Sequence, residues 1–314
     1  MRLEDAWRPV DEVAGTGVDT FVYGLSRDDG LFYPSKVGTP FGESRGPVEQ
    51  DLAAYWRVSE NMASLEARGL DPLRVLIDRT HEKKMDFVAS LRMGATPGLA
   101  DPSLMVDNAY LGGGGEGYVN TAVRKHQLAV LEELSSEYPI DALELDFSSS
   151  PGGSGLCFPV GTAAQHAHLM TEVVRGASAS IRSRGGQLGI RCYPSDNLNE
   201  QMGLDVKGWL AEGLIDFCVP MLYIYFVLDS NMPIDWLVKA AHDADASVYP
   251  VLQPYYADGA PTHDLLPVAH HATIPQLRAA AANFWRMGAD GLYACVLNLK
   301  CRFCTKSDGF ILNK

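Results

Sequence analysis

Short apolar runs alternate with longer amphipathic stretches along this chain, and this alternation most limits how it can fold. The spacing of apolar residues in the stretches predicts helices over 1–13, 120–138, 163–184, 206–213, 233–245 and 275–287. The apolar runs have the length and composition of strands and lie at 18–24, 85–93, 141–147, 187–194, 216–222, 247–253 and 291–298. Strands that alternate with helices form parallel βα units, so the pattern predicts an α/β protein.

The predicted strands follow one another without an intervening linker, which favours one domain over two. We predict a single (β/α)8 TIM barrel over residues 1–300, followed by an atypical tail at 301–314. A chain of 314 residues is long enough to bury the core of one large α/β domain. An open doubly wound sheet is the alternative, because it has the same alternation of strands and helices.

The predicted barrel is one strand short of the number that closes a TIM barrel. A helix directly precedes the strand at 18–24, so we expect the first strand to be missing at a truncated N-terminus. Strand number, tilt and shear are linked in a barrel. The strand at 18–24 should therefore be an unpaired edge opposite 291–298, and the chain should associate or dissolve poorly. In the tail, the apolar run 310–312 is the only segment available to fill the gap.

Two insertions, at 26–46 and 94–117, follow the first two predicted strands. Both come after C-terminal strand ends, where barrel enzymes build the rims of their active sites. The glycine run 112–115 lacks the Lys-Ser/Thr pair of a P-loop and the GxGxxG spacing of a dinucleotide site. We interpret it as part of a flexible rim loop.

The charge and the distribution of apolar residues exclude several classes of protein. With 26 Lys and Arg against 39 Asp and Glu, the net charge is −13, so neither nucleic acid nor anionic lipid is expected as a partner. No apolar stretch approaches the roughly 18 residues of a membrane span. Residues 1–20 have no apolar signal core, so no secretion signal is visible. Because the N-terminus is expected to be truncated, the location is unknown, with the cytoplasm as the default.

The sequence also lacks the spacings of common metal and serine-hydrolase sites. Cys301 and Cys304 form one CxxC, and no two further ligands follow before Lys314. There is no HxH at a strand end, no HExxH and no GxSxG. We expect no metal and no cofactor.

The segment 141–147 (DALELDF) is the most informative for chemistry. Side chains alternate across a strand, so Glu144 and Asp146 lie on the face opposite the two leucines. In a parallel barrel the leucines pack against helices, which directs both carboxylates into the barrel toward its C-terminal mouth. Each should raise the pKa of the other, as acid/base catalysis requires. The alternative is a structural ion pair with Arg191, which points inward from the next strand.

The stretch from 119 to 147 resembles bacterial glycosyl-hydrolase-type TIM barrels with an ELDF strand motif. That family has a helix with a Val-Arg pair and then a Tyr-x-x-Asp-Gly-(Ile/Leu)-x-Leu-Asp strand, matched here by YPIDALELD. Three further segments match the same pattern: 189–193, 203–221 and 273–298. The resemblance implies a barrel that hydrolyses glycosidic bonds, with strand-end carboxylates at Glu144 and Asp146.

The resemblance also implies an arginine and an asparagine at strand ends, at Arg191 and Asn298. Two other strand ends carry Tyr223, Gln253 and Tyr255. Aromatic faces beside amide and hydroxyl groups suit a pyranose, so we predict that these five residues bind carbohydrate. Ordinary rim packing is the alternative for the tyrosines and the glutamine.

The chain departs from the family at two strand ends. Relatives continue with Asn-Asp after the second strand, whereas this chain has Gly94-Ala95. After Phe147 relatives have an arginine or another bulky residue, and here there is a run of serines, 148–150. If those groups bind substrate, this protein has lost part of its site.

We predict a glycoside hydrolase that cleaves O-glycosidic bonds of an oligo- or polysaccharide, with Glu144 as general acid and Asp146 as an orienting carboxylate. Two neighbours on one strand do not readily straddle a glycosidic bond, so a second catalytic carboxylate should come from elsewhere on the rim. The candidates are Asp107, Glu116, Asp196, Asp229 and Asp258. The departures favour the alternative, a carbohydrate-binding barrel without activity, and a barrel with acyl- or isomerase-type chemistry is a third hypothesis.

Overall fold

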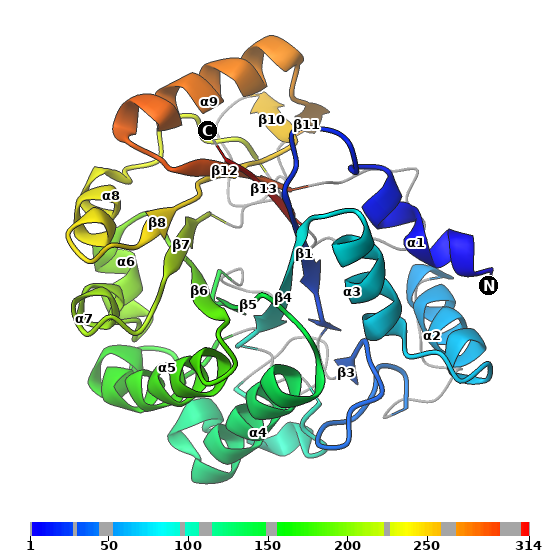
Figure 1. Cartoon of the computed structure of the whole chain (residues 1–314). Coiled ribbons are helices and arrows are strands. Elements are labelled where there is room, and N and C mark those ends of the chain that lie inside the picture. Colours follow the sequence, from blue (N-terminus) through cyan, green and yellow to red (C-terminus); the bar gives the residue numbers. More distant parts are fainter. Residues whose placement is uncertain are drawn as a thin grey trace.

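The computed structural model describes residues 2–27, 30–43, 53–94, 98–106, 115–148, 156–222, 227–258, 268–295 and 309–313. A nine-stranded sheet forms the centre of the molecule, and helices surround it (Figure 1). In spatial order its strands are β8 (Ser247–Val248), β7 (Phe217–Pro220), β6 (Gln187–Cys192), β5 (Ala142–Asp146), β4 (Asp86–Arg92), β1 (Thr20–Gly24), β13 (Gly309–Asn313), β12 (Gly291–Cys295) and β9 (Val251–Leu252).

The order of the strands in space follows their order in the chain. From β1 through β4, β5, β6 and β7 to β8, each strand is parallel to the next. A doubly wound sheet reverses its order at a switch point, so that alternative is wrong. Strands β8 and β9 are two halves of the segment 247–252, and they pair with β7 and β12 respectively. The first and last strands of the sheet, β8 and β9, therefore belong to one continuous segment, which brings the two edges of the sheet together as in a barrel. The predicted α/β barrel fold is confirmed.

The position between β1 and β12 is filled by β13, which is antiparallel to both. Ile311 is opposite Thr20 on one side and opposite Tyr293 on the other. The expected unpaired edge at 18–24 is therefore wrong, and the poor solubility derived from it loses its basis. The tail run 310–312 does fill the gap, with a direction opposite to that of the strand a TIM barrel has at this place.

Helices cover the outside of the sheet (Figure 1). They are α1 (Leu3–Asp11), α2 (Ala53–Glu66), α3 (Pro72–Glu82), α4 (Thr121–Glu137), α5 (Ala167–Arg182), α6 (Asp196–Gln201), α7 (Val206–Ala211), α8 (Asp235–His242) and α9 (Ile274–Met287). Short additions are the 3₁₀ turns η1 (Pro102–Leu104), η2 (Gly117–Val119) and η3 (Ala163–His166), and the hairpins β2 (Ser26–Arg27) with β3 (Gly30–Leu31) and β10 (Tyr255–Asp258) with β11 (Val268–His271).

Helix α9 shows how local sequence sets its own boundaries. Thr273 and Gln276 form a reciprocal capping box at its start, with a proline in the first turn. Gly288 ends it in the left-handed conformation, at a φ of 99°. By contrast, the sequence patterns above did not predict α2, α3 or α6.

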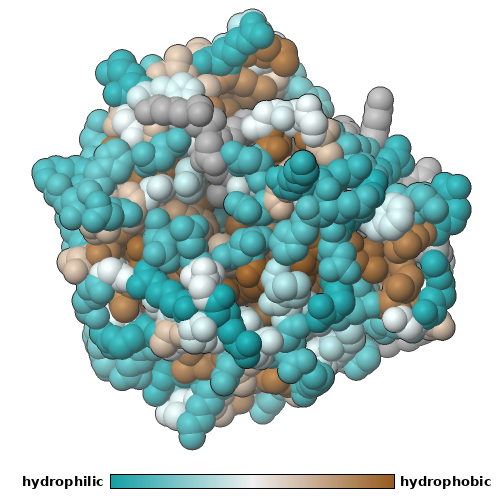
Figure 2. Space-filling view, in the orientation of Figure 1, coloured by the Kyte–Doolittle hydropathy of each residue, from teal (hydrophilic) through white to brown (hydrophobic). Residues whose placement is uncertain are grey.

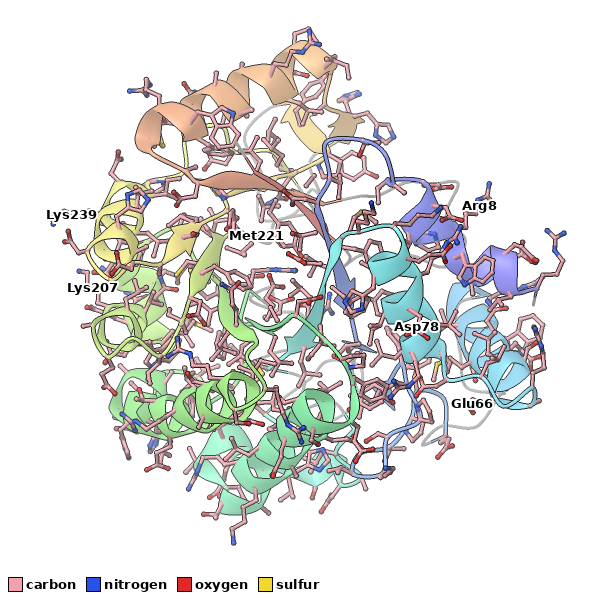
Figure 3. All side chains as sticks on the ribbon, viewed as in Figure 1. Arg8, Glu66, Asp78, Lys207, Met221 and Lys239 are labelled. Carbon is pink, nitrogen blue, oxygen red and sulfur yellow. The ribbon has the colours of Figure 1, made fainter. Side chains whose placement is uncertain are left out.

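Apolar side chains fill both sides of the sheet. A large cluster between sheet and helices includes Phe87, Leu145 and Trp209. A smaller one lies inside the ring of strands and consists of Val22, Val88, Ala142, Phe217, Val219, Met221, Val251 and Tyr293. Figure 3 shows Met221 near the centre of the ring, whereas Asp78 and Lys239 lie on the surrounding helices. The same face of the molecule is mostly hydrophilic, with apolar residues visible between the helices (Figure 2).

The first insertion packs in part against helix α4. Tyr33 and Ser35 donate their hydroxyls to the Glu133 carboxylate at 3.0 and 2.5 Å, and the Lys36 backbone N–H donates to it at 2.6 Å. Glu133 lies near the C-terminal end of α4, which leads into the N-terminal end of β5. This part of the predicted rim loop therefore contacts the end of the barrel opposite the mouth.

Three aspartates repeat one arrangement at the N-terminal end of the barrel. Each directly precedes a strand, accepts a backbone N–H from the neighbouring strand and pairs with a basic side chain at the end of a helix. The aspartates are Asp141, Asp216 and Asp290; their backbone donors are Phe87, Leu188 and Val248, and their basic partners are His81, Arg182 and His242. They join adjacent strands to the helices outside them.

We expect the substitution Asp216→Ala to lower the free energy of unfolding by about 1–3 kcal/mol, because it leaves the Leu188 N–H without its acceptor. Urea unfolding measures the loss. The matched control is Asp243→Ala, whose carboxylate pairs with the exposed Lys239 and should cost less than about 0.5 kcal/mol. Equal losses for the two variants would show that the backbone contact contributes nothing.

Candidate active site

The inward side chains of β5 and β6 form a buried ion cluster at the C-terminal end of the sheet. Asp146 is in register with Arg191, and Glu144 is one inward position deeper on β5. Arg191 Nη2 donates to Glu144 Oε1 at 2.5 Å, and Nη1 donates to Asp146 Oδ2 at 3.2 Å. The side chains of Glu144, Asp146 and Arg191 are 0%, 7% and 4% exposed. The structure thus brings together three residues that strand alternation placed on one face.

The two carboxyl oxygens of Glu144 differ in their hydrogen bonds. Its Oε1 accepts from Arg191 and from Ser90 Oγ, the latter at 2.7 Å, whereas its buried Oε2 has no hydrogen-bond partner among the described residues. Burial raises the pKa of Glu144, and the nearby charge of Asp146 raises it further, against the lowering effects of Arg191 and Ser90. The raised pKa favours the protonated form of Glu144.

Asp146 is oriented by donors on both of its oxygens. The Ser148 backbone N–H and hydroxyl donate to Oδ1 at 3.0 and 2.8 Å, while Arg191 donates to Oδ2. Ser148 was one of the departures noted in the sequence. In the structure this small residue lies just past the strand end. Its two donors hold the Asp146 carboxylate in the local side chain-to-backbone arrangement of an Asx turn.

Tyr293 is a member of the site that sequence reasoning missed. It lies on β12 inside the barrel, is 1% exposed, and accepts a hydrogen bond from Arg191 Nη2 at 2.5 Å. The ion cluster therefore reaches from β5 across the barrel to β12. Alternation along β12 was the available signal, because Tyr293 occupies an inward position of a predicted strand.

Arg92 is a second arginine beside this cluster that sequence reasoning missed. It is two residues beyond Ser90 on β4, which places its side chain on the inward side at the C-terminal strand end, and it is in register with Asp146. Arg92 is half-buried. Its guanidinium has no hydrogen bond or ion pair with any residue that the structure describes. The signal in the sequence was the same alternation that located Glu144.

The predicted sugar-binding residues are only partly within the described ranges. Gln253 is 2% exposed and donates from Nε2 to the Leu222 carbonyl at 2.7 Å. In the part of the chain that the structure describes, its buried Oε1 has no partner. Tyr255 begins β10, and its ring lies 4.9 Å from that of His271 across the hairpin. Tyr223 and Asn298 lie outside the described residues.

Within the described ranges, no hydrogen bond or ion pair links a candidate for the second catalytic carboxylate to the cluster. Asp196 pairs with Lys207 at 2.5 Å, and Asp229 accepts the Asn231 backbone N–H at 2.9 Å. Glu116 immediately precedes η2, Asp258 lies on β10, and Asp107 is not among the described residues. The contacts of Asp196 and Asp229 tie both to local neighbours.

No group of three or more His, Cys, Asp or Glu that would hold a metal ion occurs within the described ranges. Cys157, Cys192 and Cys218 are free and buried, and the CxxC at 301–304 lies outside these ranges. In the same part of the chain, no helix has the length and apolar character needed to cross a membrane.

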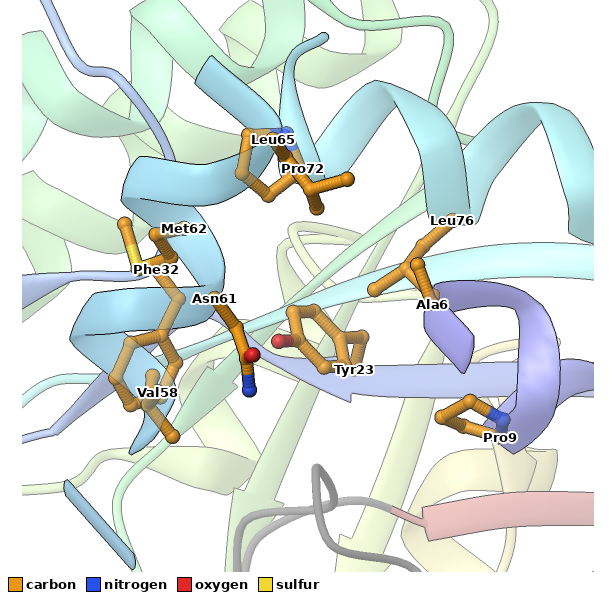
Figure 4. A pocket seen from close by; sticks show the side chains of 10 residues that line it. All are labelled: Ala6, Pro9, Tyr23, Phe32, Val58, Asn61, Met62, Leu65, Pro72 and Leu76. Carbon is orange, nitrogen blue, oxygen red and sulfur yellow. The ribbon is translucent and has the colours of Figure 1, made fainter. Parts of the chain in front are cut away.

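A separate apolar pocket lies outside the barrel, between helices α1, α2 and α3 and strand β1 (Figure 4). It has a volume of about 500 Å³, open solvent included. Its lining consists of Ala6, Pro9, Tyr23, Phe32, Val58, Asn61, Met62, Leu65, Pro72 and Leu76. None of these residues belongs to the ion cluster, so the pocket and the candidate active site are distinct.

Comparisons with known proteins identify the fold. No family model and no curated protein matches the sequence. Among solved structures, the endo-β-1,4-mannanase of Thermotoga petrophila superimposes with a TM-score of 0.54 at 14% identity, over 93% of this chain and 64% of that one. The chain therefore has the fold of this glycoside hydrolase, which agrees with the barrel described above.

Two other solved structures are more distant. An exo-β-N-acetylglucosaminidase of Vibrio harveyi matches with a TM-score of 0.48 at 10% identity, over 80% of this chain and 39% of that one. The spore cortex-lytic enzyme of Bacillus megaterium matches with a TM-score of 0.40 at 11% identity, over 67% and 46%. The chain thus spans less than half the length of both these proteins.

Proposed function

We propose that this barrel is a glycoside hydrolase that cleaves O-glycosidic bonds in an oligo- or polysaccharide. The observation that carries the proposal is the buried cluster of Glu144, Asp146 and Arg191 at the C-terminal ends of parallel barrel strands. Barrel enzymes place their catalytic groups at these ends. The fold shared with a mannanase supports the same class of reaction by analogy.

In this proposal Glu144 is the general acid. Since Oε1 already accepts two hydrogen bonds, the proton of the neutral acid resides on Oε2. That proton passes to the glycosidic oxygen as its bond to the anomeric carbon breaks, and water adds to the anomeric carbon. Asp146, oriented by Ser148 and Arg191, supplies negative charge beside the positive charge that develops on the sugar ring. A second carboxylate on the rim accepts the proton that the attacking water releases.

Sugar binding is assigned in this proposal to Arg191, Tyr223, Gln253, Tyr255 and Asn298. Gln253 has the most specific contact pattern, because its amide orientation is fixed by the Leu222 carbonyl and its Oε1 remains available as an acceptor. A sugar hydroxyl is a suitable donor for it. The ring of Tyr255 offers an apolar face to a pyranose.

Turnover of a panel of chromogenic glycosides, read together with binding to a glycan array, tests the proposed function. Hydrolysis of at least one glycoside supports the enzyme. Binding without hydrolysis supports the alternative, a carbohydrate-binding barrel without activity. The complete burial of Glu144 and the departure at Gly94 are the observations that favour this alternative. If the protein neither binds nor hydrolyses any glycan, both the enzyme and the binding hypothesis are refuted.

The substitution Glu144→Gln should abolish turnover and leave the fold intact, because the amide keeps the shape of the side chain and loses the transferable proton. We expect a rate loss of at least about a hundredfold. The matched control is Glu132→Gln on the exposed side of α4, which should change neither rate nor stability. An active Glu144→Gln enzyme of unchanged thermal stability would contradict both the catalytic role and the structural ion pair.

A further inference from the structure

Two arginines lie among the described residues at the C-terminal ends of β4, β5 and β6, in a protein that is acidic overall. The protein carries a net charge of −13. At the ends of β4, β5 and β6, however, two guanidinium groups, those of Arg92 and Arg191, lie near one oriented carboxylate, Asp146. Arg191 is already paired with Glu144 and Asp146. Protonation of Glu144, which its raised pKa favours, would leave positive charge in excess among these described residues.

The two arginines have different tasks in this arrangement. Arg191 is buried, and its Nη atoms contact both carboxylates and Tyr293. Arg92 is half-buried, and its fork of donors has no partner among the described residues, although it is in register with Asp146. The carboxylate of Asp146 has already accepted three hydrogen bonds from Ser148 and Arg191. Within the described part of the chain, the donors of Arg92 are therefore available to a ligand.

We propose that Arg92 binds an anionic group on the glycan, so that the barrel acts on acidic sugars in preference to neutral ones. This inference rests on the proposed function and specifies its substrate class. A guanidinium presents two parallel N–H donors that match a carboxylate or a sulfate ester, and it holds its charge at every physiological pH. A carboxylate on the sugar ring of a uronic acid is the group that fits best, because it is planar and binds in a bidentate manner.

The placement of Arg92 also orients such a sugar. Glu144 Oε2 and Gln253 Oε1 are two acceptor atoms that are buried without a partner among the described residues. Both residues lie two positions beyond a residue of the interior cluster, Ala142 or Val251, which places them on the inward side. A uronic acid held by Arg92 at its carboxylate can turn a hydroxyl toward Gln253 and a glycosidic oxygen toward Glu144. A neutral sugar would leave the Arg92 charge to solvent and gain only the other contacts.

Matched trisaccharides test the proposal in direct binding measurements by calorimetry on the full chain. The neutral probes are the β-1,4-linked trimers of glucose and of mannose, and the acidic probes are the corresponding glucuronate and mannuronate trimers. We expect at least one acidic trimer to bind about tenfold tighter than its neutral counterpart, the size of one charge-assisted hydrogen bond. Added salt should reduce this preference, because screening weakens an exposed charge pair. A 6-O-sulfated glucose trimer distinguishes a sulfate ester from a carboxylate as the source of the charge.

Substitutions at Arg92 separate its role from general effects. Arg92→Gln should remove the preference for the acidic trimer and leave binding of the neutral trimer unchanged, whereas Arg92→Lys should retain part of the preference, because it keeps the charge without the fork. Arg184→Gln is the matched control and should change neither, because Arg184 is exposed in the turn after α5, at the N-terminal end of the barrel. Thermal unfolding establishes that each variant is folded.

Neutral trimers that bind as tightly as the acidic ones would overturn the inference and leave the proposed function standing. An unchanged acidic preference in Arg92→Gln would overturn it as well. If only the sulfated trimer is preferred, anion recognition by Arg92 stands and the carboxylate is wrong. Absence of binding to every trimer, together with a silent glycan array, would refute the proposed function and this inference with it.

Discussion

Replacing Arg191 by methionine should lower the free energy of unfolding by about 3–5 kcal/mol, the largest loss we expect from a single substitution in this protein. Methionine has a similar length but no charge, so Glu144 and Asp146 would face each other without the cation that contacts both. Two buried carboxylates without a counter-charge destabilise a folded state strongly. Urea unfolding at neutral pH measures the effect.

The loss should depend on pH in a defined direction. Burial already raises the pKa of Glu144, and removal of Arg191 eliminates the largest influence that lowers it. A carboxyl group whose pKa is raised in the folded state binds more protons there than in the unfolded chain. Stability therefore falls as pH rises above the ordinary pKa of a glutamate and is regained on acidification. We expect the difference between native protein and Arg191→Met to shrink from about pH 7 to about pH 5.

Two comparisons keep this prediction specific. Glu144→Gln combined with Arg191→Met should recover part of the loss, because it removes one of the buried charges, and the double-mutant cycle measures the coupling. Arg175→Met should cost at most about 1 kcal/mol, since its ion pair with Glu212 is half exposed. A loss below about 1 kcal/mol for Arg191→Met would mean that water solvates the cluster.

The sequence predicted the elements of the barrel closely because their patterns are local. The segment 141–147 became β5 (Ala142–Asp146), and 187–194 became β6 (Gln187–Cys192). In these strands a buried outer face and an inner face with polar residues produce the alternation that was visible beforehand. The same reasoning placed Glu144, Asp146 and Arg191 together, because neighbouring parallel strands align their C-terminal ends.

Contacts that depend on distant segments were not predictable from local pattern. The bond from Arg191 to Tyr293 joins residues 102 positions apart across the barrel, and no spacing in the sequence encodes it. Helix α2 (Ala53–Glu66) has apolar residues that are spread around its circumference, so it lacks the clear stripe that identifies an amphipathic helix. Arg92 ends β4, and its nearest neighbour on its own strand face is Ser90 rather than an acidic residue, so its sequence context does not mark it as part of a charged site.

Strand β13 shows the limit of counting strands. Its five residues are too short and too close to the end of the chain to stand out among apolar runs. Its pairing with β1 and β12 is antiparallel, so it does not belong to the βα repeat from which the barrel was inferred. The βα repeat correctly predicts that a strand is missing between β1 and β12. That the tail fills this place depends on backbone pairing, which the pattern of apolar residues does not show.

Disruption of β13 should therefore open the barrel. In Ile311→Pro the ring fixes φ and removes a backbone N–H at a residue that is opposite both Thr20 and Tyr293. Proline in a strand with neighbours on both sides costs about 3 kcal/mol or more, because the ladder loses a bond and the ring clashes with the pleat. Both β1 and β12 would then present unpaired edges, and the interior cluster around Val22 would become accessible.

We expect Ile311→Pro to unfold at lower urea concentration and to form oligomers in sedimentation velocity experiments at concentrations where the native chain is monodisperse. Ile311→Val is the matched control, because it keeps the backbone donor and a β-branched side chain, and it should behave as the native chain does. A chain cut before residue 306 should associate more strongly than Ile311→Pro, since it loses every pairing of β13. If the cut chain remains monodisperse and equally stable, β13 does not close the sheet. The sheet would then have to be stable with β1 and β12 as open edges, which exposed backbone groups of this kind disfavour.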